Sequence, residues 1–193
     1  MESNNLAEFA YGSEEWEKAY REMVEKRLAK VEPPFAMGSP EWVDAFEKNI
    51  QEDELYKKVA KKWEGTVVIH ILGDPAIGLD GDIFMLMDLW HGDCRSVRLV
   101  PEETGKNADY VLTGNFERWE SVLKKELDVV KAMMQGKIKL KGSLPVIVRF
   151  VKACVRLVEL AAGIDTRFQT EMSEQEREAF KEWFNELRAR FGF

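Results

Sequence analysis

Hydrophobic and polar residues alternate with a helical period over the first 64 positions. Residues 12–20 and residues 38–46 resemble each other: in both, a Gly-Ser pair precedes a Trp, and a second aromatic side chain follows four positions later. The Ser of each copy can cap a helix, and Pro40 suits a first helical turn. A third apolar stripe runs through residues 52–63. The pattern predicts three helices, the first ending before a Pro-Pro pair that cannot continue it.

After this helical part the period changes to that of strands. Short β-branched or alternating apolar runs occur at residues 66–72, 83–90, 95–100, 108–113 and 137–141. A turn sequence, His91-Gly92-Asp93, separates the second and third runs and predicts a hairpin. In the last run three lysines alternate with Ile138 and Leu140. We expect the lysines to face water and the two aliphatic side chains to face the core.

Helical periodicity returns in the second half of the chain. The helical segments are residues 115–135, 143–162 and 173–190. Asp128 can cap a second helix within the first segment, and the last opens with a capping-box sequence. The elements together predict an α+β fold: a mostly antiparallel five-stranded sheet covered on one face by helices, with helical N- and C-terminal extensions.

We expect the chain to be organised as one domain with two extensions. Residues 1–35 form a helical N-terminal extension, residues 36–165 the main domain, and residues 166–193 a C-terminal helix packed on it. Trp16 and Tyr20 mark the face of the first helix that should be buried. A length of 193 residues fits this organisation better than two full domains.

Charge narrows the function classes. The chain carries 28 Lys+Arg against 35 Asp+Glu, a net charge of -7, which disfavours non-specific nucleic-acid binding. Residues 114–164, by contrast, hold 10 basic and 5 acidic side chains. Two cysteines fit a reducing compartment, and the first five residues lack the features of a signal peptide, so a cytoplasmic location is expected. Four charges within residues 144–163 disfavour a membrane span.

One short stretch has a family resemblance. Residues 132–142, Ala-Met-Met-Gln-Gly-Lys-Ile-Lys-Leu-Lys-Gly, resemble the signature of the sterol carrier protein-2 (SCP2) family, in which a helix ends before an alternating Lys strand. Residues 108–113 and the helix after them fit the family's strand-then-helix order. Upstream, residues 38–65, with Trp42 and Trp63, are similar to the helical lead-in of prokaryotic members. The resemblance covers roughly residues 36–165.

The resemblance implies a domain with an apolar tunnel between sheet and helices, holding a sterol, a fatty acid or an acyl-CoA. The residues expected to contact the lipid are Phe84, Leu86, Trp119, Met133, Met134, Ile147, Phe150, Val151 and Cys154. Arg149, Lys152 and Arg156 are candidates for a charged head group. Alternatives remain open: the helix over residues 144–160 is a packed core helix, a ligand wall or an association surface, and its basic residues form a solvated stripe or a head-group site.

The sequence offers little support for catalysis or for a metal site. Asp80 and Asp82 lack the remaining positions of a Ca²⁺ loop, and turn chemistry accounts for the acids around them. His70 and His91 are too few for a zinc site or a catalytic triad. The family implies no catalytic motif and no cofactor. We therefore expect a non-enzymatic protein without bound metal.

Two functions remain. The first is intracellular binding or transfer of a lipid or fatty acyl ligand, including isoprenoid-like ligands, with transient contact to a membrane surface as an open option. The alternative is an SCP2-like interaction or dimerisation module in which side chains fill the tunnel and no ligand binds. A homodimer is compatible with both.

Overall fold

The computed structural model describes residues 7–193, so the first five residues, on which the expectation of no signal peptide rests, lie outside it. Five strands form one sheet in the order β4-β3-β2-β5-β6. The strands are β2 (Glu64–Leu72), β3 (Ile83–Trp90), β4 (Asp93–Leu99), β5 (Tyr110–Asn115) and β6 (Lys139–Lys141). The central pair β2–β5 is parallel and the other three pairs are antiparallel. The predicted α+β class and mostly antiparallel sheet are confirmed.

The hairpin between β3 and β4 is also confirmed. His91 and Gly92 take positive φ angles of 50° and 88°, the conformation that a tight two-residue hairpin turn requires. In β6, Lys139 and Lys141 are exposed, and Ile138 just before the strand is fully buried. The expected alternation of lysines toward water and aliphatic residues toward the core is therefore present.

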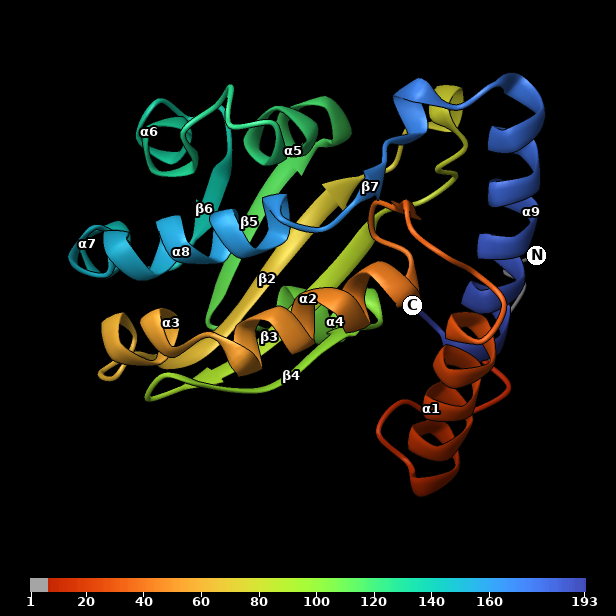
Figure 1. Cartoon of the computed structure of the whole chain (residues 1–193), viewed down its shortest axis with the longest axis horizontal. Coiled ribbons are helices and arrows are strands. Elements are labelled where there is room, and N and C mark those ends of the chain that lie inside the picture. Colours follow the sequence, from red (N-terminus) through yellow and green to blue (C-terminus); the bar gives the residue numbers. More distant parts are fainter. Residues whose placement is uncertain (1–6) are drawn as a thin grey trace.

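Six helices cover one face of the sheet (Figure 1). They are α2 (Pro40–Glu52), α3 (Glu54–Val59), α5 (Phe116–Leu123), α6 (Val129–Met134), α7 (Leu144–Arg149) and α8 (Val151–Ala162). Local capping explains several boundaries: the Ser39 side chain accepts a hydrogen bond from the Trp42 amide, and Asp128 accepts one from the Lys131 amide. The expected helix division at Asp128 is confirmed.

The predicted single helix over residues 143–162 is wrong. Phe150, with φ -101° and ψ 25°, leaves the helical region and separates α7 from α8. No Gly or Pro marks this break in the sequence. Phe150 instead packs edge-to-face on Trp63, with ring centroids 5.2 Å apart, so a tertiary contact accompanies the change of direction.

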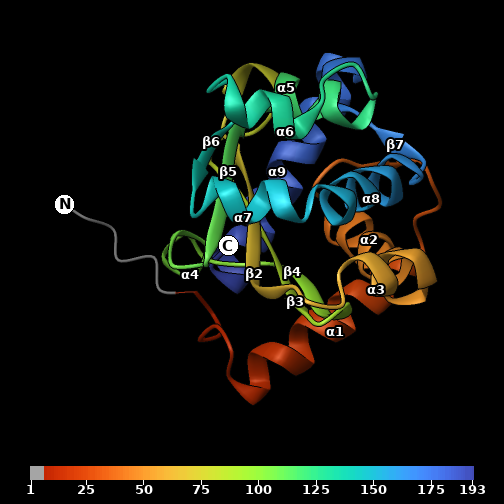
Figure 2. The ribbon, with the colours of Figure 1, turned by 90° about the vertical axis from the view of Figure 1, so that its left-hand side faces the viewer.

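The opposite face of the sheet has a smaller cluster of its own. The short helix α4 (Glu102–Lys106) lies on that side (Figure 2). The cluster consists of Val68, Phe84, Val100, Ala108 and Val111, with Leu86 packed against it. Gly105 of α4 lies directly on the Phe84 ring, where a Cβ atom would come within 2.5 Å.

The terminal helices α1 (Glu14–Leu28) and α9 (Glu174–Phe191) pack against each other beside the domain. Trp16 and Tyr20 are buried there, as predicted, and the Trp16 indole donates a hydrogen bond to the Phe191 carbonyl at 2.9 Å. The capping box at the start of α9 is formed. A two-stranded parallel pair, β1 (Phe35–Ala36) with β7 (Thr166–Arg167), joins the segment between α1 and α2 to the segment between α8 and α9.

Candidate functional site

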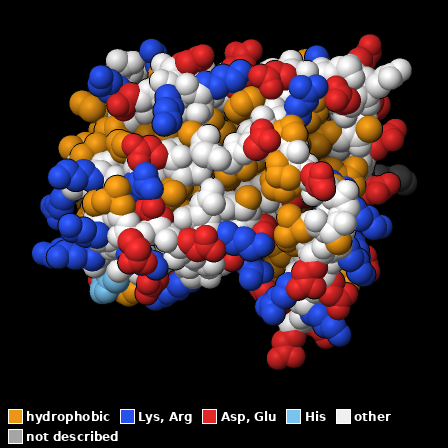
Figure 3. Space-filling model, viewed as in Figure 1, with side chains coloured by type: hydrophobic (Ala, Val, Ile, Leu, Met, Phe, Trp, Pro, Cys, Tyr) orange, Lys and Arg blue, Asp and Glu red, His pale blue; other side chains and the backbone are white. Residues whose placement is uncertain are grey.

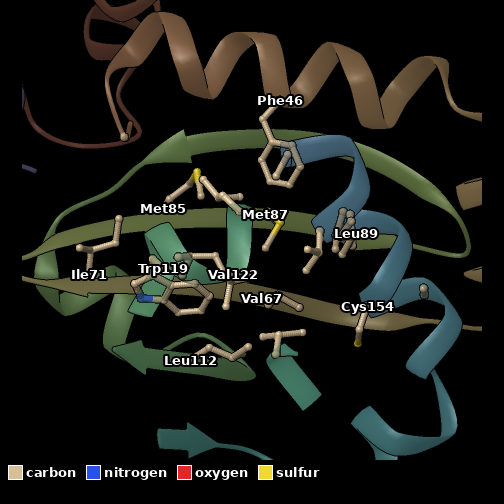
Figure 4. Close-up of a pocket in the computed structure, with 18 of the residues that line it drawn as sticks. Phe46, Val67, Ile71, Met85, Met87, Leu89, Leu112, Trp119, Val122 and Cys154 are labelled. Carbon is tan, nitrogen blue, oxygen red and sulfur yellow. The ribbon is translucent and has the colours of Figure 1, made fainter. Parts of the chain in front are cut away.

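An apolar cavity of about 100 Å³ lies between the sheet and the helices (Figure 4). The strands supply alternate residues, because successive side chains of a strand point to opposite faces. The sheet side is lined by Val67, Ile69 and Ile71 of β2, Ile83, Met85, Met87 and Leu89 of β3, and Leu112 of β5. Phe46, Val122 and Cys154 are among the helical residues that close the other side.

Four of the predicted lipid-contacting residues line this cavity. They are Trp119 of α5, Met133 of α6, Ile147 of α7 and Cys154 of α8. They come from four different helices, which the chain brings together over the sheet. Their role in contacting a ligand stays a prediction, but their position is the one it requires.

Phe84 and Leu86 lie on the wrong face of the sheet for that role. In β3 the odd-numbered residues from Ile83 to Leu89 line the cavity, and Phe84 and Leu86 belong to the cluster on the opposite face. The sequence carries one signal for this: Asp88 shares the face of Phe84 and Leu86, whereas the odd-numbered face is uniformly apolar.

Met134, Phe150 and Val151 also lie outside the cavity lining. Met134 ends α6 and is 67% exposed. Phe150 occupies the break between α7 and α8, and Val151, the first residue of α8, is 38% exposed. Ile147 before the break and Cys154 after it both line the cavity, whereas Phe150 and Val151 at the break do not.

The three head-group candidates differ in their surroundings. Arg156 is held by acids of the protein itself: its Nε and Nη2 atoms bind the two Asp53 carboxylate oxygens at 3.0 and 2.6 Å, and its Nη1 binds Glu159 at 2.8 Å. These contacts neutralise its charge. Arg149 and Lys152 are exposed on α7 and α8. Only the latter two therefore present a charge to an incoming ligand.

Polar hydrogen-bonding groups are scarce in the cavity wall. Three tryptophans contribute to it, but their indole N–H groups are engaged elsewhere: Trp42 binds the Thr166 hydroxyl, Trp63 the Gly65 carbonyl and Trp119 the His70 carbonyl. The Tyr56 hydroxyl is different. Tyr56 lines the cavity and is 1% exposed, and burial raises the pKa of its hydroxyl, so this group stays protonated. Sequence reasoning missed this donor.

The two cysteines near this site are poor nucleophiles. Burial raises the pKa of the Cys154 thiol to about 11 and the pKa of the Cys94 thiol to about 12. Both thiols are therefore protonated at neutral pH, whereas the thiolate is the reactive form.

A groove of about 210 Å³ adjoins the cavity between α8 and the connection from α5 to α6. Val122, Val129 and Val158 line both spaces, so they form the boundary between the groove and the interior. Lys125 and Glu159 lie at the groove's surface. Lys125 has a positive φ of 59°, which is uncommon outside Gly, Asn and Asp. It is a further cation at this opening, and the sequence pattern did not single it out.

His70 belongs to a polar network on the other face of the sheet. Its Nε2 lies 2.7 Å from Asp82 Oδ2 and its Nδ1 lies 2.9 Å from Thr113 Oγ1. The imidazole also stacks on Phe84. The contacts join β2, β5 and the segment before β3. Within residues 7–193 no group of three or more His, Cys, Asp or Glu side chains is arranged to hold a metal ion.

Comparison with known proteins identifies the fold family. A model of the "SCP-2 sterol transfer family" matches residues 44–154. A crystal structure of sterol carrier protein 2 is 30% identical, with a TM-score of 0.62 over 66% of this chain and 98% of that one. A solution structure from Thermus thermophilus, titled as possibly a sterol carrier protein, is 28% identical, with a TM-score of 0.63 over 70% of this chain and 94% of that one.

The matched region contains most of the cavity wall. Residues 44–154 fall within residues 36–165, which resemble the family in sequence, and they include the cavity-lining strands and Cys154. No curated protein sequence matches the chain. Among the described residues, no helix has the length and apolar character needed to cross a membrane. The chain belongs to the SCP-2 sterol transfer family.

Proposed function

We propose that this protein binds and transfers a lipid without chemical change, and that the cavity between sheet and helices holds the apolar part of the ligand. The observation that carries the proposal is the nearly uniform apolar wall contributed by β2, β3, β5 and the covering helices. Removing apolar surface from water contributes about 25 cal/mol per Å². A hydrocarbon tail therefore needs few polar contacts to bind there. Fatty acids, acyl-CoA and isoprenoid or sterol-like lipids are the candidate classes.

The cavity must enlarge to take such a ligand. At about 100 Å³ it is smaller than an engineered apolar cavity of about 150 Å³ that holds benzene. Two features of the wall would allow this enlargement. Met85, Met87 and Met133 have flexible, unbranched side chains that can change conformation, and the helices that cover the sheet are interrupted at Phe150. We infer that the ligand enters from the groove beside Val129 and Val158 and separates α8 from α6 as it does so.

The Tyr56 hydroxyl gives the interior one place for a ligand oxygen. Burial raises the pKa of this hydroxyl, so it stays protonated and can donate a hydrogen bond. A ligand that carries a hydroxyl or carbonyl oxygen at its inserted end would satisfy it. An anionic head group would instead remain at the surface, where Lys125, Arg149 and Lys152 are the available cations.

The proposal is non-enzymatic. Two observations support it. Burial keeps the thiols of Cys94 and Cys154 protonated, and His70 is hydrogen-bonded to Asp82 and Thr113 on the face of the sheet away from the cavity. We also propose residues 36–165 as the lipid-binding unit, with α1 and α9 as its attached extensions.

Native mass spectrometry of the purified full-length chain tests this function. We expect a fraction of the protein to carry one lipid-sized adduct that disappears after organic extraction and returns on mixing with a fatty acid. A matched pair of variants locates the adduct. Val67→Phe fills the cavity and should lower occupancy, whereas Leu86→Phe, on the opposite face of the sheet, should retain it. A single unliganded mass before and after mixing would refute lipid binding.

A further inference from the structure

The outer surface of α7 and α8 has an apolar stripe that the cavity does not use. Val148, Val151 and Val155 are 46%, 38% and 42% exposed. Val151 and Val155 are four residues apart on α8, the separation at which helical side chains share a face, and Val148 precedes the break at Phe150 on the adjoining α7. Other residues of α8, including Cys154 and Leu157, line the cavity. The same short helix thus has one apolar side toward the interior and another toward water.

Positive charge accompanies this stripe. Arg149 and Lys152 are exposed among the three valines, and within residues 7–193 neither forms an ion pair. They differ in this from Arg156, which Asp53 and Glu159 neutralise. In Figure 3, hydrophobic side chains with Lys and Arg beside them are visible over the region of α6, α7 and α8. This basic surface contrasts with the chain as a whole, which carries a net charge of -7.

The stripe leads directly to the opening of the cavity. Val155 is exposed and also lines the groove beside α8. In that groove it is followed by Val158, which belongs to the cavity wall as well. A continuous apolar path therefore runs from the exposed valines through the groove to the interior.

We propose that the face formed by Val148, Val151, Val155, Arg149 and Lys152 docks on an anionic lipid surface and places the groove against it. This inference rests on the proposed lipid-binding function and specifies where the ligand is exchanged. Exposed valines enter the boundary between head groups and acyl chains, and the two cations bind lipid phosphates. The anionic lipid surface repels the acidic remainder of the chain. Attraction at the α7–α8 face alone therefore also sets the orientation of the protein on the lipid surface.

A second copy of the chain fits this face less well. A symmetric dimer through the same surface would bring Arg149 and Lys152 close to their own counterparts. Like charges in an interface oppose association unless acids separate them. An anionic lipid surface has the complementary charge and an apolar layer beneath it.

Vesicle flotation of the full chain tests the proposal. The probes are phosphatidylcholine vesicles with and without phosphatidylglycerol. We expect binding only to the vesicles with phosphatidylglycerol, weakened by high salt because screening shortens the range of charge attraction. The double variant Arg149→Glu with Lys152→Glu should lower the partition coefficient at least about tenfold. Lys18→Glu with Arg21→Glu, which reverses two exposed charges three residues apart on α1, is the matched control and should retain binding.

The apolar part of the face has its own pair of variants. Val148→Ser with Val151→Ser should lower vesicle binding, whereas Leu55→Ser, which changes a 49% exposed residue of α3, should not. Equal binding by all variants, or no binding to anionic vesicles, would overturn the docking proposal. A dimer abolished by the valine variants would overturn it in favour of a second copy. Binding of a free fatty acid, measured without vesicles, distinguishes a failure of docking from a failure of lipid binding. We expect the charge-reversal variants to retain this binding even where they lose vesicle binding.

Discussion

The guanidinium of Arg156 binds both carboxylate oxygens of Asp53, at 3.0 and 2.6 Å, across 103 positions of the chain. Asp53 lies at the junction of α2 and α3, and its Oδ1 also accepts a hydrogen bond from the Tyr56 amide. The ion pair therefore connects α8 to the junction of α2 and α3, and all three helices contribute residues to the cavity wall. Arg156 is a structural residue of the cavity and is not free to bind a ligand's head group.

Replacing Arg156 with Met should make the stability of the protein less dependent on pH in the acid range. The hydrogen bond from Arg156 lowers the pKa of Asp53. A depressed carboxyl pKa stabilises the folded state above the unfolded-state value of about 3.9, and this contribution is lost as the pH falls through the folded-state pKa. Urea unfolding should therefore show Arg156→Met less stable than the natural chain at about pH 7, with the difference narrowing below about pH 3.9.

Arg149→Met is the control for this prediction, since Arg149 is exposed and belongs to the same pair of helices. It should leave stability nearly unchanged. The carboxyls of Asp82 and Asp109 also have lowered pKa values, but both are present in every protein compared, so their effects cancel. A constant difference between Arg156→Met and the natural chain at all pH values would contradict the assigned role of the pair.

Tyr56→Phe should change ligand preference. The variant removes one hydroxyl, and its affinity for a long-chain alcohol should fall about 2- to 13-fold, the range expected for a net hydrogen bond of about 0.5–1.5 kcal/mol. Affinity for a hydrocarbon of the same length should not fall. Tryptophan fluorescence can report both titrations, because Trp42, Trp63 and Trp119 line the cavity. Equal losses for alcohol and hydrocarbon would show that the hydroxyl does not meet the ligand's oxygen.

Trp16→Ala should detach α1 from α9. Trp16 is fully buried and stacks on Tyr20, with ring centroids 4.7 Å apart. Truncating a buried Trp lowers the free energy of unfolding by about 3–5 kcal/mol. Calorimetry should detect this loss, and limited proteolysis should cut first near α1. Trp90→Ala, which changes a partly exposed Trp, should have a much smaller effect. An unaltered thermal midpoint for Trp16→Ala would contradict the observed packing.

Gly105→Ala should destabilise the protein without altering lipid affinity. A Cβ at this position would lie 2.5 Å from the Phe84 ring, on the face of the sheet away from the cavity. We expect a loss of about 1–3 kcal/mol from overpacking. Gly163→Ala, whose Cβ would meet its neighbours at an ordinary 3.5 Å, should change stability by less than about 0.5 kcal/mol. A parallel loss of ligand affinity in Gly105→Ala would show that the two faces of the sheet are coupled.

The elements that sequence predicts best are those defined by local chemistry. Ser39, Asp128 and Ser173 each accept a hydrogen bond from a backbone amide three residues later, and these contacts depend only on neighbouring residues. The His91–Gly92 turn is similar, because its backbone conformation selects the residue types. Such features can be recognised without knowing the rest of the fold.

The parts of the site that sequence did not predict depend on distant contacts. In β3 the side away from the cavity is marked by a single polar residue, Asp88, beside the apolar Phe84 and Leu86, so the signal that separates Phe84 from Met85 is weak. Phe150 breaks its helix where it meets Trp63, which lies 87 positions earlier in the sequence. Arg156 is neutralised by Asp53, an equally remote residue. Trp119, Met133, Ile147 and Cys154 line the cavity, a position that the family resemblance implies through its arrangement of helices over the sheet, and their contact with a ligand stays a prediction.

The central claim is that the space beside Val67 opens to hold a hydrocarbon chain. Its most direct test is a tryptophan-fluorescence titration of delipidated protein with a fatty acid, repeated with Val67→Phe and Leu86→Phe. Saturation at one ligand per chain for the natural protein and for Leu86→Phe, with much weaker binding by Val67→Phe, is the predicted result. A signal that never saturates, or the same saturation curve for all three proteins, would contradict it.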